Sequence, residues 1–377
     1  MKQDNFKKTA CRLLESANVQ TNGQHPWDIR IHNENFYERV MTKGSLGLGE
    51  SYMDKWWDCD RLDEFFYRIL LQKLDSAVIS FIDSLKILKA RLINMGKRSR
   101  AFEIGKRHYD IGNNLYRLML DKLMIYSCGY WENTADLNQA QEHKLDMICR
   151  KLNLKPGMRL LDIGCGWGGT ARYAAEKYGV KVDGITVSKQ QAIFAKNLCR
   201  GLPVKIRLQD YRSLEGIYDS IVSVGMIEHV GVKNYAVFFK VARERLAKDG
   251  LFLLHTIGSN ESGVNVDAWI ERYIFPNSMI PSGKQLLEAG EGHFIMEDWH
   301  NFGADYDKTL MAWYHNFKSN REALKENYDE RFYRMWTYYL LACAGCFRAR
   351  QMQLWQIVFS PEGIPGGYVK PYPAAPH

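Results

Sequence analysis

The pattern of apolar and polar positions changes near residue 150. Before that point, the first ~95 residues carry helix signals, and the glycine-rich segment GSLGLGESYMDKWW (44–57) predicts a series of turns. Beyond Leu71, apolar side chains recur at positions 74, 78, 81, 82, 85, 88 and 92, which is the spacing of a helix with one buried side. The pattern therefore predicts a mainly helical N-terminal region that ends in an amphipathic helix.

After residue 150, short apolar runs alternate with amphipathic segments. The runs cover 158–163, 180–186, 204–210, 218–224 and 251–257, and helix patterns occur in ARYAAEKY, SKQQAIFAKNL and NYAVFFKVARERLA. Strands that alternate with helices in this way predict an α/β fold with a doubly wound, mostly parallel sheet. Such sheets bind ligands at the carboxyl ends of their strands, so we expect the site at that edge.

A glycine-rich turn, LLDIGCGWGG, follows the first predicted strand and leaves two ligands open. Gly164, Gly166 and Gly169 satisfy the loose G-x-G-x-x-G pattern that binds the pyrophosphate of a nicotinamide cofactor. Asp162, however, would repel a pyrophosphate and attract a cationic amino-acid group, which favours S-adenosylmethionine. Asp183 lies about twenty residues further on, where a nicotinamide enzyme needs an acid, and keeps the first alternative open.

Polar side chains occur at five consecutive strand ends. A single histidine in such a place is more often a packed residue than a catalyst, but five polar groups together predict one crevice. They are Asp162, Thr186, Asp210, Glu228 and His255. An amino methyltransferase of nucleic acids would carry an Asn/Asp-Pro-Pro-Tyr turn after the fourth strand, where this chain has IEHVG. A nucleic-acid partner is therefore not expected.

The formal net charge of +8 favours an anionic partner. Between residues 86 and 107 stand eight basic residues and one acid, Glu103. This stretch is either a solvated helix end and linker or a surface that meets anionic lipid headgroups, and its position beside an amphipathic helix favours the second interpretation. No apolar run reaches the ~18–20 residues of a membrane-spanning helix, and the N-terminus lacks the pattern of a secretory signal, so a cytoplasmic location is expected.

Eight cysteines are scattered along the chain, and Cys343 and Cys346 form a C-x-x-C pair. The pair lies in an apolar, helix-like stretch, which predicts core packing; we expect neither a redox role nor a metal. The chain ends in SPEGIPGGYVKPYPAAPH, which holds five of the ten prolines and predicts a disordered tail.

Ten motifs carry a family resemblance. They are GSLGLGESYMDKWWDCDRLD, KRHYDIGNNLY, YSCGYW, LLDIGCGWGG, TVSKQQ, SVGMIEHVG, FLLHTIGS, WIERYIFPN, EDWHNFGADYDKTLMAWY and ACAGCFRAR. On these motifs the chain resembles the bacterial cyclopropane-fatty-acyl-phospholipid synthases from about Trp27 to Phe359. YSCGYW and IEHVG together are far more specific than the glycine turn.

The resemblance implies an activity and a set of site residues. The family transfers a methyl group from S-adenosylmethionine to the cis double bond of a phospholipid acyl chain, and the resulting carbocation closes to a cyclopropane when bound bicarbonate removes a proton. The implied cofactor contacts are Tyr126, Ser127, Asp162, Gly164, Gly166, Thr186, Gln191, Asp210 and Tyr211. The implied bicarbonate pocket comprises Cys128, Glu228, His255, the backbone of Ile257, and Tyr314.

Within that pocket, the resemblance implies separate roles. Glu228 would position the bicarbonate and relay its proton, His255 and Tyr314 would hydrogen-bond it, and Cys128 would offer its backbone amide. For Cys343 we expect a structural role. The chain departs from the family at Asp183, where a small or apolar residue is usual, and at Cys346, which replaces an alanine-like residue.

The expected organisation has four parts. They are a mainly helical lipid-binding domain (1–95), a basic linker (96–108), a methyltransferase domain of Rossmann-like fold (109–360) and a tail rich in proline and glycine (361–377). We expect a homodimer attached peripherally to the inner face of the cell membrane, on phospholipids with unsaturated acyl chains. The alternatives left open are simple methylation of the chain, methylation of a headgroup amine, and a lipid-binding protein without catalysis.

Overall fold

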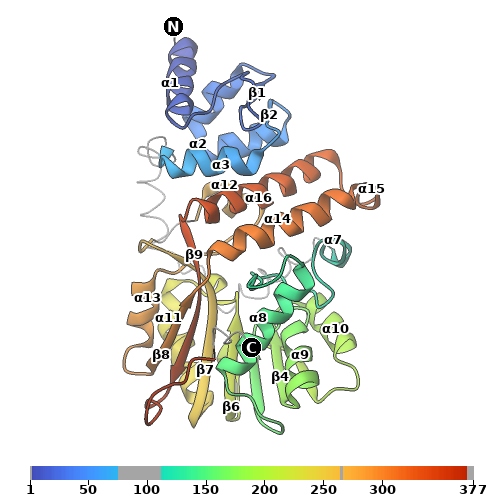
Figure 1. The fold of residues 1–377 in the computed structure, drawn as a ribbon, viewed down its shortest axis with the longest axis vertical. Helices are drawn as coiled ribbons and strands as arrows, with labels where there is room; N and C mark the ends of the chain where they lie inside the picture. The colour runs from blue at the N-terminus through green and yellow to red at the C-terminus, as the bar shows by residue number, and fades with distance from the viewer. Residues whose placement is uncertain (1, 75–111, 264–265, 372–377) are drawn as a thin grey trace. The chain divides into compact units, whose positions relative to one another are not determined.

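The computed structural model describes residues 2–74, 112–263 and 266–371. It divides into two compact units, each built from segments that lie far apart in the sequence (Figure 1). The first comprises 1–93, 264–276 and 306–352, and the second comprises 94–263, 277–305 and 353–377. The apolar stripe beyond Leu71 and the basic stretch fall largely between residues 75 and 111, outside the described residues.

The first unit is mainly helical. Its elements are α1 (Lys2–Ser16), β1 (Arg30–Ile31), α2 (Asn35–Met53), β2 (Trp57–Asp58), α3 (Leu62–Leu71), α12 (Ala268–Tyr273), most of α14 (Ala304–Ser319), α15 (Arg321–Leu324) and α16 (Glu330–Arg348). Its core is rich in aromatic side chains: the Trp269 ring centroid lies 4.4 Å from that of Tyr338, and the Tyr52 and Trp57 centroids are 5.1 Å apart. The predicted helical character of this region is confirmed.

Within this unit, the turns predicted over residues 44–57 are wrong for residues 44–53 and are found only at 54–56, just before β2. Residues 44–53 continue helix α2, which has one kink at Gly44, where φ is 56°. The remaining glycines serve close packing instead of turns. A Cβ atom at Gly49 would lie 2.3 Å from the Trp269 ring, and one at Gly47 would lie 2.2 Å from the Arg39 carbonyl oxygen. Glycine was therefore a misleading turn signal here, because the missing side chain lets helix α2 pack closely.

The C-x-x-C pair lies on α16, as the apolar pattern predicts. Gly345, between the two cysteines, packs directly on α3: a Cβ atom there would lie 2.7 Å from the Tyr67 backbone nitrogen. Burial raises the pKa of the Cys343 thiol well above its ordinary value, which opposes formation of a reactive thiolate. The motif thus marks a helix-packing contact.

The second unit contains a seven-stranded sheet in the order β5-β4-β3-β6-β7-β9-β8. The strands are β3 (Arg159–Ile163), β4 (Lys181–Thr186), β5 (Val204–Leu208), β6 (Tyr218–Val224), β7 (Leu246–Ser259), β8 (Ile295–Asn301) and β9 (Met352–Ser360). Strands β3 to β7 pair in parallel, whereas β8 and β9 are antiparallel. The predicted mostly parallel α/β sheet is confirmed, and all five predicted strands are present.

Helices cover both faces of this sheet. The helices of this unit are α7 (Asn113–Met119), α8 (Leu137–Lys151), α9 (Gly169–Tyr178), α10 (Lys189–Leu198), α11 (Tyr235–Arg245) and α13 (Gly283–Gly290). Leu253 belongs to the core cluster that contains α8 and α9 residues, whereas the neighbouring Phe252 packs on Phe238 of α11. Because successive strand residues point to opposite faces, α8 and α9 lie on one face and α11 on the other.

The tail departs from its prediction. Residues 361–371 are placed against the second unit: the Tyr368 hydroxyl donates to the Lys151 carbonyl oxygen at 2.8 Å, and Lys370 lies 3.3 Å from Asp298. This part of the tail is not disordered, because its tyrosine and lysine find buried partners; residues 372–377 lie outside the described residues. In the described parts of the chain, none of the helices combines the length and the apolar character needed to cross a bilayer.

Candidate active site

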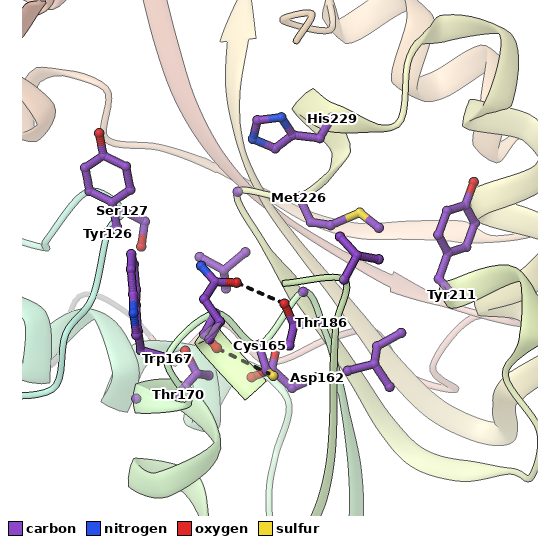
Figure 2. Close-up of a pocket in the computed structure, with 18 of the residues that line it drawn as sticks. Tyr126, Ser127, Asp162, Cys165, Trp167, Thr170, Thr186, Tyr211, Met226 and His229 are labelled. Atoms are coloured by element: carbon purple, nitrogen blue, oxygen red, sulfur yellow. Dashed lines mark hydrogen bonds between the residues drawn. The ribbon is translucent and has the colours of Figure 1, made fainter. Parts of the chain in front are cut away.

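A cavity of about 160 Å³ opens at the carboxyl edge of the parallel strands in the second unit (Figure 2). Its walls come from the segments that follow β3, β4, β5 and β6, and from residues 124–127, which precede α8. All nine predicted cofactor-binding residues line it: Tyr126, Ser127, Asp162, Gly164, Gly166, Thr186, Gln191, Asp210 and Tyr211. The structure thus brings these residues together, and their binding roles stay a prediction.

The glycine turn forms the floor of the cavity between β3 and α9. The backbone amides of Gly164 and Cys165 both donate to the Ile185 carbonyl oxygen, at 3.0 and 2.9 Å, which ties the turn to β4. Gly164 has φ of +88°, and a Cβ atom there would lie 2.9 Å from the Met226 side chain. At Gly166, with φ of +54°, a Cβ atom would meet open space. The turn therefore needs glycine for its backbone conformation and leaves room for a ligand.

Asp162 is a buried carboxyl group in this cavity. It is 1% exposed, and its Oδ2 atom has no hydrogen-bond partner in the described structure. Burial raises the pKa of Asp162 to about 7, and the nearby Lys144 ammonium partly opposes that shift. A buried carboxylate without a partner is unfavourable, so a bound cation at this place would relieve the cost.

The second-strand and third-strand ends are held by local hydrogen bonds. The Thr186 hydroxyl donates to Gln191 Oε1 at 2.9 Å, which draws the start of α10 onto the end of β4. Asp210 accepts from the Arg212 backbone amide at 2.9 Å, and the Tyr211 ring packs edge-on against Phe238. The Tyr211 hydroxyl is buried and has no hydrogen-bond partner in the described structure, so it can serve a ligand.

The structure does not support the nicotinamide alternative, because Asp183 does not reach the cavity. Asp183 lies inside β4, and its carboxylate accepts from the Tyr218 hydroxyl at 2.9 Å and lies 3.3 Å from the Arg207 guanidinium. It is not among the cavity-lining residues, so it could not hold a ribose there. The second strand ends at Thr186 instead, and the acids that line the cavity are Asp162 and Asp210.

Glu228 is buried next to the cavity along the chain: Met226 and His229 line the cavity on either side of it, although Glu228 itself is not a lining residue. The Ile257 backbone amide of β7 donates to Glu228 Oε1 at 2.8 Å, whereas Oε2 is buried without a hydrogen-bond partner in the described structure. Burial raises the pKa of Glu228 to about 7. This carboxyl group can therefore either hold or release a proton near neutral pH.

His255 lies on β7, two residues before Ile257, opposite the last residue of β6. Its Nδ1 atom lies 3.2 Å from Gln356 Nε2 of β9, and its Nε2 atom is buried without a hydrogen-bond partner in the described structure. Burial lowers the pKa of His255 well below its ordinary value, so the ring is neutral. If the Gln356 amide donates to Nδ1, the ring proton lies on Nε2, where it can be donated to an anion.

The remaining predicted catalytic residues are placed as follows. Cys128 is fully buried directly after Ser127, and its thiol donates to the Gly129 carbonyl oxygen at 3.2 Å. The Ile257 amide donates to Glu228, as described above. Tyr314 lies on α14 in the first unit, and its membership of the site stays a prediction. Of the five residues predicted to line one crevice, Asp162, Thr186 and Asp210 line the cavity. Glu228 and His255 are buried but are not among its lining residues.

Several lining residues were not singled out from the sequence. They include Trp167, Thr170 and Met226. Trp167 is fixed by a 3.0 Å hydrogen bond from its indole nitrogen to Asn113 and by the Tyr116 ring, whose centroid is 4.6 Å away. The signal was present, since Trp167 stands inside the glycine turn and Asn113 inside KRHYDIGNNLY. A fully buried lysine, Lys144, was missed as well, because a lysine on an amphipathic helix ordinarily points to solvent.

Comparisons with known proteins agree with this geometry. The family model for mycolic acid cyclopropane synthetases matches residues 96–357. A cyclopropane-fatty-acyl-phospholipid synthase from Escherichia coli K12 is 55% identical over 365 residues, which covers 97% of this chain and 95% of the relative.

Solved structures give the same picture. A mycolic acid cyclopropane synthase complexed with SAH and CTAB has a TM-score of 0.65 and 33% identity, over 68% of this chain and 97% of that one. A cyclopropane synthase from Mycobacterium tuberculosis has a TM-score of 0.65 and 31% identity, over 71% and 99%. The chain therefore belongs to the cyclopropane-fatty-acyl-phospholipid synthase family of S-adenosylmethionine-dependent enzymes.

Proposed function

We propose that this chain transfers a methylene group from S-adenosylmethionine to the cis double bond of unsaturated acyl chains in membrane phospholipids, and that bound bicarbonate collects the proton released on ring closure. The observation that carries the proposal is the buried, unpartnered Oδ2 atom of Asp162 in a cavity at the carboxyl edge of the sheet. It supports a ligand with a cationic amino-acid end, and a Mycobacterium tuberculosis relative is named as an S-adenosylmethionine-dependent methyltransferase.

The cavity residues fit this cofactor. Asp162 offers an acceptor for the ammonium group, the glycine turn leaves open space at Gly166, and the Tyr211 hydroxyl is available for a polar edge. When bound, S-adenosylmethionine supplies an electrophilic methyl group. The chain's own contribution is to hold that group in line with the alkene, and proximity of this kind is worth about 7–11 kcal/mol of the barrier.

The buried side chains of Glu228 and His255 fit an anion. Glu228 with a pKa near 7 and neutral His255 each carry one buried polar atom without a partner, and both can donate a hydrogen bond. Bicarbonate held by such donors would supply a base close to the cofactor. In its ionised form, Glu228 would then accept that proton from the anion on its own Oε2 atom, while Gln356 keeps the His255 ring oriented.

Exclusion of water is required, because an alkene is a weak nucleophile and the carbocation that follows methylation would be trapped as an alcohol. The aromatic residues Tyr126 and Trp167 line the cavity and can stabilise positive charge through cation–π attraction, which is worth about 2 kcal/mol in a dry site. Cys128, through its backbone amide, and Tyr314 are proposed to complete the anion pocket.

Membrane attachment is the second part of the proposal. Eight basic residues between 86 and 107 would contribute about 1 kcal/mol each near an anionic surface. A homodimer would present two such surfaces and strengthen attachment through avidity. We therefore propose a peripheral location at the inner face of the cell membrane. We also propose domain boundaries near residues 95, 108 and 360.

In the decisive experiment, the protein is given S-adenosylmethionine, the methyl donor, with an isotopically labelled methyl group. The lipid vesicles supplied with it differ only in the unsaturation of their acyl chains. Label should enter the acyl chains of unsaturated vesicles alone, and mass analysis of those chains should show a gain of one methylene. Label in the headgroups would indicate an amine methyltransferase, equal label on saturated chains would remove the alkene from the reaction, and donor binding without turnover would indicate a lipid-binding protein.

Bicarbonate is tested separately. Turnover should fall in an assay depleted of carbon dioxide and recover when bicarbonate is added back. A wild-type rate that ignores bicarbonate would remove the anion from the mechanism and leave the methyl transfer standing.

The basic stretch is tested by replacing Lys97, Arg98 and Arg100 with glutamine. Binding to anionic vesicles should weaken and become less sensitive to salt, because fewer charges remain to be screened. Unchanged sedimentation with vesicles would assign this stretch to a solvated linker.

A further inference from the structure

Helix α8 carries two buried polar side chains that both bond to Ser127. The Gln141 amide nitrogen donates to the Ser127 carbonyl oxygen at 2.8 Å, and the Lys144 ammonium donates to the Ser127 hydroxyl oxygen, also at 2.8 Å. Both side chains are 0% exposed. Residues three apart lie on one face of a helix, so α8 holds Ser127 by its backbone and its side chain together.

A fully buried lysine is costly and therefore informative. Lysine is almost never fully buried without a partner, because its charge must leave water. Here, burial lowers the pKa of Lys144 to about 8, while the carboxylates of Asp121 and Asp162 and the Cys128 thiol oppose that shift. The amine therefore stays mostly protonated at pH 7. Its charge lies next to Ser127, which lines the cofactor cavity.

The direction of the hydrogen bond to Ser127 is fixed by chemistry. A lysine ammonium has donors only, so the Ser127 oxygen must accept in this bond. The hydroxyl proton of Ser127 is then left for another partner, and Ser127 lines the cavity. Lys144 thus turns Ser127 into a hydrogen-bond donor toward the ligand.

The cavity then presents two complementary groups. Asp162 is an acceptor with a buried, unpartnered oxygen, and Ser127 is a donor. An amino acid's free end carries the matching pair, an ammonium and a carboxylate. We propose that Lys144 is a positioning residue that makes Ser127 a donor to the carboxylate of the cofactor's amino-acid end, so that the site selects the intact cofactor over a form without that carboxylate. This inference rests on the proposed function, because it assumes that S-adenosylmethionine occupies the cavity.

The experiment compares two ligands by titration calorimetry in the absence of lipid: S-adenosylmethionine and decarboxylated S-adenosylmethionine. Lys144→Met should weaken binding of the intact cofactor about tenfold, because a charge-assisted hydrogen-bond chain to its carboxylate is lost. The same variant should leave the affinity for the decarboxylated form unchanged within about twofold. The measured quantity is therefore the selectivity ratio of each protein.

Two further variants are compared with Lys144→Met: one removes the proposed donor, and the other is a matched control. Ser127→Ala removes the proposed donor without shortening the lysine, so it should lower the selectivity ratio to the same extent, and the double variant should be no worse than either single one. Lys151→Met is the matched control: Lys151 is a fully buried lysine on the same helix, but it pairs with Asp298 at 3.4 Å and does not line the cavity. It should leave the selectivity ratio unchanged.

The outcomes separate this inference from the proposed function. Equal weakening of both ligands by Lys144→Met, or additive losses in the double variant, would overturn the inference while S-adenosylmethionine binding by the wild type stands. Should Lys144→Met fail to fold, an unchanged selectivity ratio in Ser127→Ala would overturn it equally. A wild-type protein that binds neither ligand would overturn the proposed function and the inference together.

Discussion

Asp63 in the first unit and Asp162 in the second are buried to nearly the same degree, at 2% and 1% exposure, yet their surroundings differ completely. Asp63 accepts from Arg61 at 3.0 Å and from Arg348 at 2.9 Å, and Arg348 also pairs with Asp307. Burial alone would raise the pKa of Asp63, but these arginine hydrogen bonds outweigh it and lower the pKa. Around Asp162 the effect of burial prevails.

The contrast separates structural from functional charge. In the first unit, a buried carboxylate is neutralised by the protein itself, which fixes α16 on α3. In the second unit, Asp162 and Glu228 each have a buried oxygen atom that finds no hydrogen-bond partner in the described structure. Carboxyl groups with raised pKa values in a cavity are the more informative sign of function, because folding alone gives no reason to leave them unpaired.

Replacing Glu228 with glutamine should have the largest effect. Glutamine can still accept the Ile257 amide bond, but it cannot relay a proton, so turnover should fall about a hundredfold or more. Donor affinity, measured by calorimetry, should change by less than about twofold. Turnover close to the wild-type value would show that the unpartnered oxygen of Glu228 is not part of the reaction.

Asp162→Asn should weaken donor binding about thirtyfold, or about 2 kcal/mol, because the ammonium group would lose a buried charged partner. The free energy of unfolding should stay the same or rise, since an unpaired buried charge is removed. A loss of stability without a loss of affinity would place Asp162 with Asp63 and break the comparison.

Asp63→Asn should do the opposite. We expect the free energy of unfolding to fall by about 1–2 kcal/mol, less than for an isolated buried pair because Arg348 keeps Asp307. Denaturant titration measures this change, and donor affinity serves as the control. A weaker affinity for the donor would mean that the arginine network of the first unit also shapes the cofactor cavity.

The affinity for S-adenosylmethionine should also depend on pH. With a pKa near 7 in the free protein, Asp162 must lose a proton to pair with a cation, so binding releases a proton below that pH. Affinity should therefore rise with pH by up to about tenfold per unit between pH 5.5 and 7 and then level off. Asp162→Asn should flatten this profile, and a profile that persists in the variant would assign the titration to another group.

The sequence predicted the sheet well, because the central parallel strands β3 and β6 are buried on both faces and each appears as a short apolar run. The cavity residues followed from the same logic, since strand ends meet at one edge. Helix α2 was mispredicted because its glycines looked like turns, although Gly49 is there to let the Trp269 ring approach.

Two features of the site could not be predicted from the sequence because they depend on tertiary contacts. The bond between Glu228 and the Ile257 amide depends on how β6 pairs with β7, where the register shifts between Tyr218 and Ser220. The buried Lys144 sits in a helix whose composition is polar, and no local pattern reveals that it points inward. Charge burial of this kind is decided by packing across the fold.

The anchored tail has a practical consequence for handling the protein. Ile364 and Tyr368 pack on the core cluster that α8 shares with the sheet, and Lys370 reaches the buried Asp298. Removing the chain after Ser360 would open this side of the sheet to water, so a shortened version should be prone to aggregation. A purification tag attached after His377 would leave those anchors in place.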